Sequence, residues 1–124
     1  TVTAFTSLSL HPPLILICVD RTASMAGPLE TTEHFAVHLL GEGQEALSRR
    51  FAETGGKRFA EAEITRGIAE LPLLDGALAR LQCRITARYP GGDHRIIVGE
   101  VLDAIAFDGA PLLYYRGRYA RMSP

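Results

Sequence analysis

The sequence predicts a single, mostly β domain: an all-β barrel or sandwich into which short helices are inserted. The clearest strand runs from Ala77 to Arg88, where apolar and polar residues alternate. A Pro-Gly-Gly-Asp turn, 90–93, separates it from a long partner strand, His94–Phe107. With 124 residues, 47% of them hydrophobic and 22% charged, the chain can bury one core and is not intrinsically disordered.

Two strands are predicted before the first helix. Apolar and polar residues alternate over Thr1–Leu10, which is typical of a half-buried strand. Pro12 and Pro13 end this strand, because proline cannot donate a hydrogen bond to a neighbouring strand. The run Leu14–Val19 is apolar throughout and predicts a strand that is buried on both faces. We expect this pair of strands to form the densest part of the core.

Two short helices and a third strand follow. The helices are predicted over Gly27–His34 and Gln44–Glu53, the second because its apolar residues are spaced for one helical face. Between them, Phe35–Leu40 has strand composition and ends before two glycines. The stretch Lys57–Glu70 has weak periodicity and is predicted to be a loop with one short helical turn.

The last part of the chain contains two further signals. Gly99 lies within the long strand, where we expect a bulge or a close approach of another segment. Asp108-Gly109 predicts a turn before a final strand over Leu112–Tyr119.

Charge and cysteine usage limit the possible partners. The chain has 13 Lys and Arg against 14 Asp and Glu and no basic block, so neither nucleic acid nor a membrane surface is expected as a partner. The longest apolar run is far too short to cross a bilayer. Cys18 and Cys83 both lie in apolar stretches, which indicates buried free thiols in a reducing compartment, and we therefore expect a cytoplasmic protein.

Several well-known site motifs are absent from the sequence. The four histidines do not occur at metal-ligand spacing with one another or with a cysteine, so no metal site is expected. There is no G-x-S-x-G nucleophile motif. The glycines complete neither a dinucleotide-binding G-x-G-x-x-G nor a phosphate-binding P-loop.

Short hydroxyl side chains gather at the ends of the first two predicted strands. Thr6, Ser7 and Ser9 lie at the end of the first, and the turn Asp20–Ser24 follows the second. Hydroxyls, backbone N–H groups and an arginine are the groups that hold a phosphate or a polar cofactor tail. Serine and threonine are also common in turns, so a purely structural role is the alternative.

Two features in the second half of the chain also have two interpretations. His94 follows a Gly-Gly-Asp turn and is either a ligand-facing group or an ordinary strand histidine. The segment Tyr114–Tyr119 contains arginines flanked by aromatic residues. It is either a stacking platform for a planar ligand or an edge strand whose Arg116 and Arg118 extend into water.

Seven blocks, in order, resemble one known family. Phe5–Leu14, FTSLSLHPPL, resembles S-x-T-S-x-S-x-x-P-P-L, and Cys18–Ser24, CVDRTAS, resembles C-V-D-R-x-x-S. The other matching blocks are FAVHL at 35–39, LSRRFA at 47–52 with KRF at 57–59, LDGA at 74–77, GDH at 92–94 with VGEV at 98–101, and PLLYYRG at 111–117. Together these blocks resemble the short-chain flavin reductase family, whose flavin reductase-like domains are FMN-binding split barrels.

The resemblance implies a mostly β split barrel of Greek-key type with short inserted helices. It also implies a homodimer that uses NADH or NADPH to reduce FMN, or FAD or riboflavin, and that supplies reduced flavin to a flavin-dependent monooxygenase. One alternative is a flavin-binding or carrier protein of the same fold without reductase activity. Another is a split barrel that has lost flavin and acts as a dimeric partner-binding module.

Residue roles follow from the same resemblance. The implied flavin contacts come from the first two blocks: Phe5, Thr6, Ser7, Ser9, Asp20, Arg21 and Ser24. Ser48, Phe51 and Lys57 are expected near the phosphate or adenylate end of the ligand. His94 is expected beside the nicotinamide, where it could stabilise charge on the reduced flavin, and Arg116 and Tyr119 are expected to close the same pocket.

The chain departs from the family pattern in three places. His38 stands where asparagine is usual, and Met25 stands where threonine or serine is common. The family's first strands, upstream of Thr1, have no counterpart here. We therefore expect residues 1–124 to be one flavin reductase-like domain whose native N-terminal strands lie outside this sequence.

Overall fold

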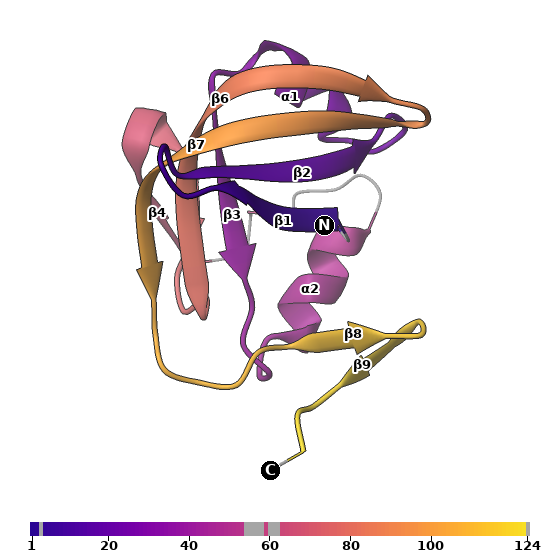
Figure 1. Ribbon diagram of the computed structural model, residues 1–124. Helices are drawn as coiled ribbons and strands as arrows, with labels where there is room; N and C mark the ends of the chain where they lie inside the picture. Colours follow the sequence, from indigo (N-terminus) through magenta and orange to yellow (C-terminus); the bar gives the residue numbers. More distant parts are fainter. Residues whose placement is uncertain (3, 54–58, 60–62, 124) are drawn as a thin grey trace.

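The protein is represented by a computed structural model that describes residues 1–2, 4–53, 59 and 63–123. Its main element is a five-stranded antiparallel sheet in the order β1-β2-β7-β6-β3 (Figure 1). Over the described residues this sheet does not close on itself. Its strands, in chain order, are β1 (Ala4–Ser9), β2 (Leu14–Asp20), β3 (His34–Leu39), β6 (Ala79–Gly91) and β7 (His94–Ala106).

Two helices and two small hairpins surround the sheet. The helices α1 (Ala26–Thr31) and α2 (Glu45–Ala52) lie on either side of β3 in the chain. One hairpin pairs β4 (Ile64–Arg66) with β5 (Pro72–Leu74) around a short 3₁₀ helix, η1 (Ile68–Glu70); the other pairs β8 (Leu113–Tyr115) with β9 (Arg118–Ala120). No helix in the described ranges is both long enough and apolar enough to span a membrane. The predicted mostly β fold with short inserted helices is confirmed.

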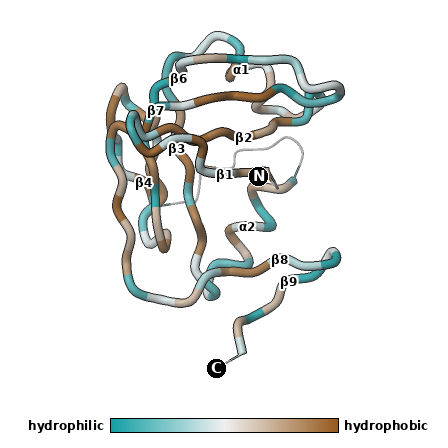
Figure 2. The backbone as a smooth tube through the Cα atoms, in the orientation of Figure 1, coloured by the Kyte–Doolittle hydropathy of each residue, from teal (hydrophilic) through white to brown (hydrophobic). Residues whose placement is uncertain are grey.

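The core lies where β2 and β7 meet β3 and β6. Hydrophobic residues are concentrated along β2 and β7 (Figure 2), and Phe35 on β3 and Cys83 on β6 complete the core with them. On β2, every second residue is buried and the residues between them are half-buried, which confirms that this strand is covered on both faces. The core side chains come from five elements of the fold: Ile15, Ile17, Val19, Leu29, Phe35, Cys83 and Ile97. Burial raises the pKa of the Cys83 thiol to about 11, so this thiol stays protonated and unreactive at neutral pH.

Gly99 allows the ring of Phe35 to cross the sheet surface. A Cβ atom at Gly99 would lie 2.6 Å from Phe35 Cζ and 3.0 Å from Cys83 Cβ, so no larger residue fits without movement. The register of β6 against β7 also shifts between Ile85 and Ala87, next to this position. The close approach predicted at Gly99 is therefore confirmed, and a bulge in the partner strand accompanies it.

The first predicted strand forms, but it is not half-buried. Residues of β1 are exposed except for Ser9, because β1 lies at the edge of the sheet and pairs only with β2. Among the described residues, no other strand pairs with its outer edge. The prediction that β1 and β2 form the densest part of the core was wrong for β1.

Three local boundaries also differ from the predictions. The hairpin of β4 and β5 was missed, because strands of three residues are too short to show a period; residues 57–58 and 60–62 of that predicted loop lie outside the described ranges. The final predicted strand is a hairpin that turns at Arg116 and Gly117, where φ is 53° and 75°. The turn predicted over 90–93 contains only Gly92 and Asp93, since β6 continues through Gly91.

His38 joins the β4–β5 hairpin to the main sheet. Its Nε2 accepts a hydrogen bond of 3.0 Å from the backbone N–H of Leu74 on β5. Burial lowers the pKa of His38, and the positive charge of Arg80, opposite it on β6, lowers it further. The contact requires a neutral ring, because a protonated imidazole has no acceptor nitrogen.

We expect Gly99→Ala to destabilise the protein by about 1–3 kcal/mol, because the added methyl group must displace the ring of Phe35. The free energy of unfolding measured with urea tests this. Gly43→Ala is the matched control: nothing lies within 4 Å of a Cβ atom there. We expect the control to change stability by less than about 0.5 kcal/mol. Equal stabilities of the two variants would contradict the close packing of Gly99.

We expect His38 to make the protein less stable in mild acid. Its pKa is lower in the folded protein than in the unfolded chain, where it is near 6.5. Below about pH 6.5 the unfolded chain therefore binds a proton that the folded protein does not, and stability falls as pH falls. His38→Gln retains an acceptor for Leu74 N–H but does not titrate. Between about pH 8 and about pH 5.5, the free energy of unfolding measured with urea should fall more for the wild type than for His38→Gln. An equal fall in the two proteins would exclude His38 as the cause.

Candidate functional site

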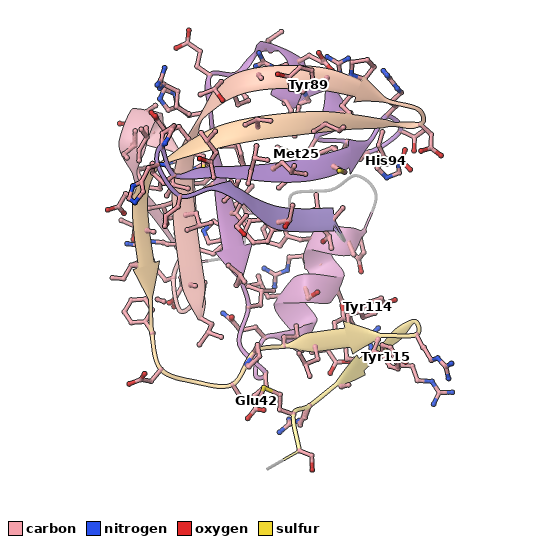
Figure 3. All side chains as sticks on the ribbon, in the orientation of Figure 1. Met25, Glu42, Tyr89, His94, Tyr114 and Tyr115 are labelled. Atoms are coloured by element: carbon pink, nitrogen blue, oxygen red, sulfur yellow. The ribbon has the colours of Figure 1, made fainter. Side chains whose placement is uncertain are left out.

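A large cavity lies between the sheet, the helices and the C-terminal hairpin. Its volume is about 1210 Å³, and residues of β2, α1, β3, α2, β4, β5, β8 and β9 line it. Most of the lining is apolar, including the rings of Phe51 and Phe59. Met25 and Tyr114, which also line the cavity, lie far apart in Figure 3. The cavity is large enough for a planar aromatic ligand with a polar extension, since ligand sites usually occupy about 300–1,000 Å³.

Backbone hydrogen bonds place the β8–β9 hairpin beside α2. After β7 the chain returns to the end of β3, where Leu112 N–H donates to the Leu40 carbonyl at 2.9 Å and Glu42 N–H donates to the Ala110 carbonyl at 3.0 Å. Gly41 and Pro111 form a bridge between these bonds. The segment that leads into the hairpin is therefore anchored where α2 is about to begin.

Four side chains from α2 and the hairpin form one group, the Tyr119 cluster: Ser48, Arg49, Tyr114 and Tyr119. Ser48 Oγ and Tyr119 Oη are 2.9 Å apart and share a hydrogen bond. The Arg49 guanidinium lies 4.7 Å from the centre of the Tyr119 ring, and the Tyr114 ring meets the same ring edge-on at 5.1 Å. The cluster presents hydroxyl groups and an exposed aromatic ring, Tyr114, to the cavity.

A second group of predicted site residues lies where the end of β2 meets the β6–β7 turn. We call it the turn junction; it comprises Asp20–Thr22 and Gly92–His94. Asp20 pairs with His94 across the two strands. Arg21 N–H donates to the Asp93 carbonyl at 2.9 Å, and Arg21 Nε donates to the Gly92 carbonyl at 2.8 Å. His94 Nδ1 lies 2.6 Å from Asp93 Oδ1.

Asp20 is held in its ionised form at this junction. Its Oδ1 accepts hydrogen bonds from the Thr22 hydroxyl at 2.7 Å and from the Thr22 backbone N–H at 2.8 Å. These bonds lower the pKa of Asp20, and the nearby His94 adds a smaller effect in the same direction. The carboxylate also closes a local Asx-type turn, so the direction in which the chain leaves β2 is defined.

The other predicted residues fall into separate places. Phe5, Thr6 and Ser7 are exposed on β1, with Thr6 Oγ1 donating to the Ser7 carbonyl at 3.2 Å, and Ser9 is half-buried at the end of that strand. None of these four lines the cavity, whereas Ser24 and Phe51 do. Phe51 packs edge-on against Phe59, with ring centres 4.9 Å apart. Arg116 lies in the β8–β9 turn over the Tyr115 ring, and Lys57 lies outside the described residues.

The predicted residues are therefore grouped differently from the expectation. Ser48 and Tyr119 were expected at different ends of the ligand, and they share a hydrogen bond. His94 and Tyr119 were expected in one pocket, yet His94 lies at the tip of the β6–β7 hairpin, well away from Tyr114 and Tyr115 on β8 (Figure 3). His94 does not line the cavity that Tyr119 lines.

Two members of the site were missed by sequence reasoning. Arg49 had one usable signal, a glutamate four residues earlier: Glu45 Oε1 lies 2.7 Å from Arg49 Nη2 and holds the guanidinium on the helix surface. His38 was noted only as a departure from a motif, although it lines the cavity and contacts β5. Nothing in the local pattern distinguishes such a histidine from one that faces solvent.

Comparisons with known proteins match nearly the whole chain to flavin reductases. The family model "Flavin reductase like domain" matches residues 1–123. The reductase component of 4-hydroxyphenylacetate 3-monooxygenase from Thermus thermophilus is 45% identical over 124 residues, covering 98% of this chain and 77% of that protein. FMN reductase (NADH) SmoA from Agrobacterium fabrum is 40% identical over 123 residues, covering 99% of this chain and 70% of that protein.

A solved structure shows the same fold. It is the NADH:FAD oxidoreductase SgcE6 of Streptomyces globisporus in complex with NAD and FAD fragments. That structure matches with a TM-score of 0.94 and 40% identity over 99% of this chain and 76% of that one. Such relatives are longer than the chain, which spans between 66% and 77% of their lengths. The resemblance found in the sequence is thereby confirmed, and the chain belongs to the family of flavin reductase-like domains.

Proposed function

We propose that the protein is an NAD(P)H:flavin oxidoreductase that reduces FMN, or FAD or riboflavin, by hydride transfer. The observation that carries this proposal is the agreement of nearly the whole chain with a NADH:FAD oxidoreductase whose structure holds NAD and FAD fragments. The relative named as an NADH-dependent FMN reductase supports the same chemistry. The chain spans only part of these proteins, so the activity is proposed from the domain that they share.

The described residues are compatible with a flavin and a nicotinamide nucleotide. The cavity has room for a flat ring system, its lining is largely apolar, and the Tyr119 cluster adds hydroxyl groups and an exposed ring. Planar heterocycles bind well between apolar and aromatic side chains with a few polar groups that set their orientation. Ser24 and Ser48 line the cavity, and we expect their hydroxyl groups to hydrogen-bond a phosphate or ribityl group of the flavin.

Residue roles in the proposed reaction are carried over from the family resemblance; of these residues, Ser24, Ser48, Phe51 and Tyr119 line the cavity. A bound flavin supplies the hydride acceptor and a nicotinamide supplies the donor, so the protein mainly holds the two rings together. Phe5, Thr6, Ser7, Ser9, Asp20 and Ser24 are proposed to bind the flavin. Ser48, Phe51 and Lys57 are proposed near its phosphate or adenylate end. His94 is proposed beside the nicotinamide, where an imidazole N–H can stabilise developing negative charge. Arg116 and Tyr119 are proposed to close the nicotinamide pocket.

We further propose that the protein is a homodimer and that a flavin-dependent monooxygenase consumes the reduced flavin. Exposed apolar side chains on β1 and β7, including Phe5, Leu8 and Leu102, support a second copy as the partner. The relatives named as reductase components support the monooxygenase. Both cysteines are free, which supports a cytoplasmic location. A monomeric mass by light scattering would contradict the dimer.

The purified protein should oxidise NADH or NADPH in air only when flavin is added. This is measured as loss of the nicotinamide absorbance with FMN, FAD or riboflavin as acceptor. We expect His94→Ala to lower kcat/KM for the nicotinamide by about 10- to 100-fold, a typical effect of losing one positioned polar group. The control is His11→Ala, which replaces an exposed histidine in the β1–β2 turn and should leave the rate unchanged.

One outcome would count against the reductase activity and another only against the role of His94. Flavin binding without any oxidation of NADH or NADPH would support the carrier alternative instead. Unchanged kinetics of His94→Ala in an active enzyme would remove His94 from the reaction but leave the reductase activity established.

Tyr119→Phe should weaken the binding of phosphorylated flavins but not the binding of riboflavin. The substitution keeps the ring beside Arg49 and removes only the hydroxyl that bonds Ser48, so Ser48 loses its fixed orientation. We expect about five- to tenfold weaker binding of FMN and FAD, the cost of one hydrogen bond, and little change for riboflavin, which has no phosphate. Fluorescence titration of each flavin measures this. Tyr115→Phe, an exposed ring outside the cavity, is the control, and an equal effect on riboflavin would be the contrary result.

A further inference from the structure

The side chain of Arg21 is engaged with the protein rather than directed only at a ligand. The family motif implied that Arg21 contacts flavin. In the structure its Nε–H donates to the Gly92 carbonyl at 2.8 Å, and its backbone N–H donates to the Asp93 carbonyl at 2.9 Å. Arg21 therefore binds two consecutive carbonyl groups of a turn that lies 71 residues further along the chain.

That turn needs such a partner. Gly92 and Asp93 form a two-residue connection between two strands of 13 residues each, and Gly92 has a φ of 67°. The tip of a long hairpin has few packing contacts, and carbonyls in its turn have no partner within the ladder. The junction with β2 extends to the pair Asp20 and His94, and Arg21 continues the contact past the last strand pair onto the turn itself.

The orientation of His94 depends on this turn. His94 Nδ1 lies 2.6 Å from Asp93 Oδ1, and the Asp93 side chain is 91% exposed. No core packing therefore holds the carboxylate, and its position is set by the backbone to which it is attached. A shift of that backbone moves the carboxylate and the imidazole together.

We propose that Arg21 is a positioning residue for the reductase reaction: it holds the β6–β7 turn and thereby fixes the imidazole of His94. The inference rests on the proposed function and adds a residue that acts through another one. Arg21 also joins two turns: its own, Asp20–Ser24, which is expected to contact the flavin, and the β6–β7 turn before His94, which is expected beside the nicotinamide. The relative placement of the two ligands is then set partly by one guanidinium group.

Arginine suits this role better than lysine. The guanidinium is planar and its Nε–H points in a fixed direction, so it can hold one carbonyl while the backbone N–H of the same residue holds the next. A lysine ammonium keeps the charge, but it is a compact group on a flexible stem and does not reproduce the directed bond. Arg21→Lys therefore removes the Nε bond to Gly92 and leaves the charge and the backbone bond to Asp93 in place.

The test compares Arg21→Lys with Arg84→Lys in the purified protein. Arg84 lies on the same hairpin and forms a side-chain hydrogen bond of 2.8 Å with Glu100, away from the turn. At saturating FMN we expect Arg21→Lys to lower kcat/KM for NADH by about tenfold or more, because small misplacements of reacting groups are costly. The dissociation constant for FMN should change less than about twofold, because the Arg21 guanidinium is engaged by the Gly92 carbonyl and not by the flavin. Amide hydrogen exchange at residues 92–95 should become faster. Arg84→Lys should change neither kcat/KM for NADH, nor the FMN dissociation constant, nor the exchange rates at residues 92–95.

Two results would overturn the inference. A rise in the FMN dissociation constant, together with loss of the preference for FMN over riboflavin, would mean that Arg21 binds the flavin phosphate directly. Unchanged kcat/KM for NADH in an active enzyme would mean that the contact is dispensable. If the wild type oxidises no NADH or NADPH, the proposed function itself fails; hydrogen exchange then tests the Arg21–turn contact separately, and unchanged exchange rules it out.

Discussion

The pairing of β2 with β7 is the contact on which the other features of this domain depend. It joins the β1–β2 hairpin to the long β6–β7 hairpin over seven residue pairs, from Leu14 and Glu100 to Asp20 and His94. Because the side-chain period of a strand is two, this register decides which residues of both strands face the core. It places Ile15, Ile17 and Val19 in the core, and it brings the two turns of the junction together.

The cavity results from a different kind of contact. A few backbone hydrogen bonds between the end of β3 and the segment before β8 hold the C-terminal hairpin beside α2. The Ser48–Tyr119 bond and the Arg49–Tyr119 contact then complete this wall. Little core packing supports it, since α2 has no fully buried residue. A wall formed in this way can adapt to a ligand more easily than the sheet can.

The proposed chemistry fits this difference in how the two groups of residues are attached to the fold. The turn junction, which carries His94, is attached to the best-packed strands, whereas the Tyr119 cluster lies on the more loosely attached helix and hairpin. Hydride transfer requires close control of the distance between two rings, whereas recognition of a phosphate or adenylate tail requires less precise positioning. The two places also differ in charge: hydrogen bonds lower the pKa of Asp20 and favour its carboxylate at the junction, whereas burial lowers the pKa of His38 and favours its neutral ring inside the fold.

Local patterns in the sequence were sufficient to predict the strands β2, β3, β6 and β7, the helix α2, the close approach at Gly99 and, through ordered motifs, the family. They could not predict that β1 is exposed, that residues 64–74 contain a hairpin, or that Ser48 meets Tyr119. Periodicity records which face of an element is apolar, but it carries no information about which distant segment covers that face. The contacts from Ser48 to Tyr119 and from Arg21 to Gly92 each span 71 residues, and only the tertiary structure determines them.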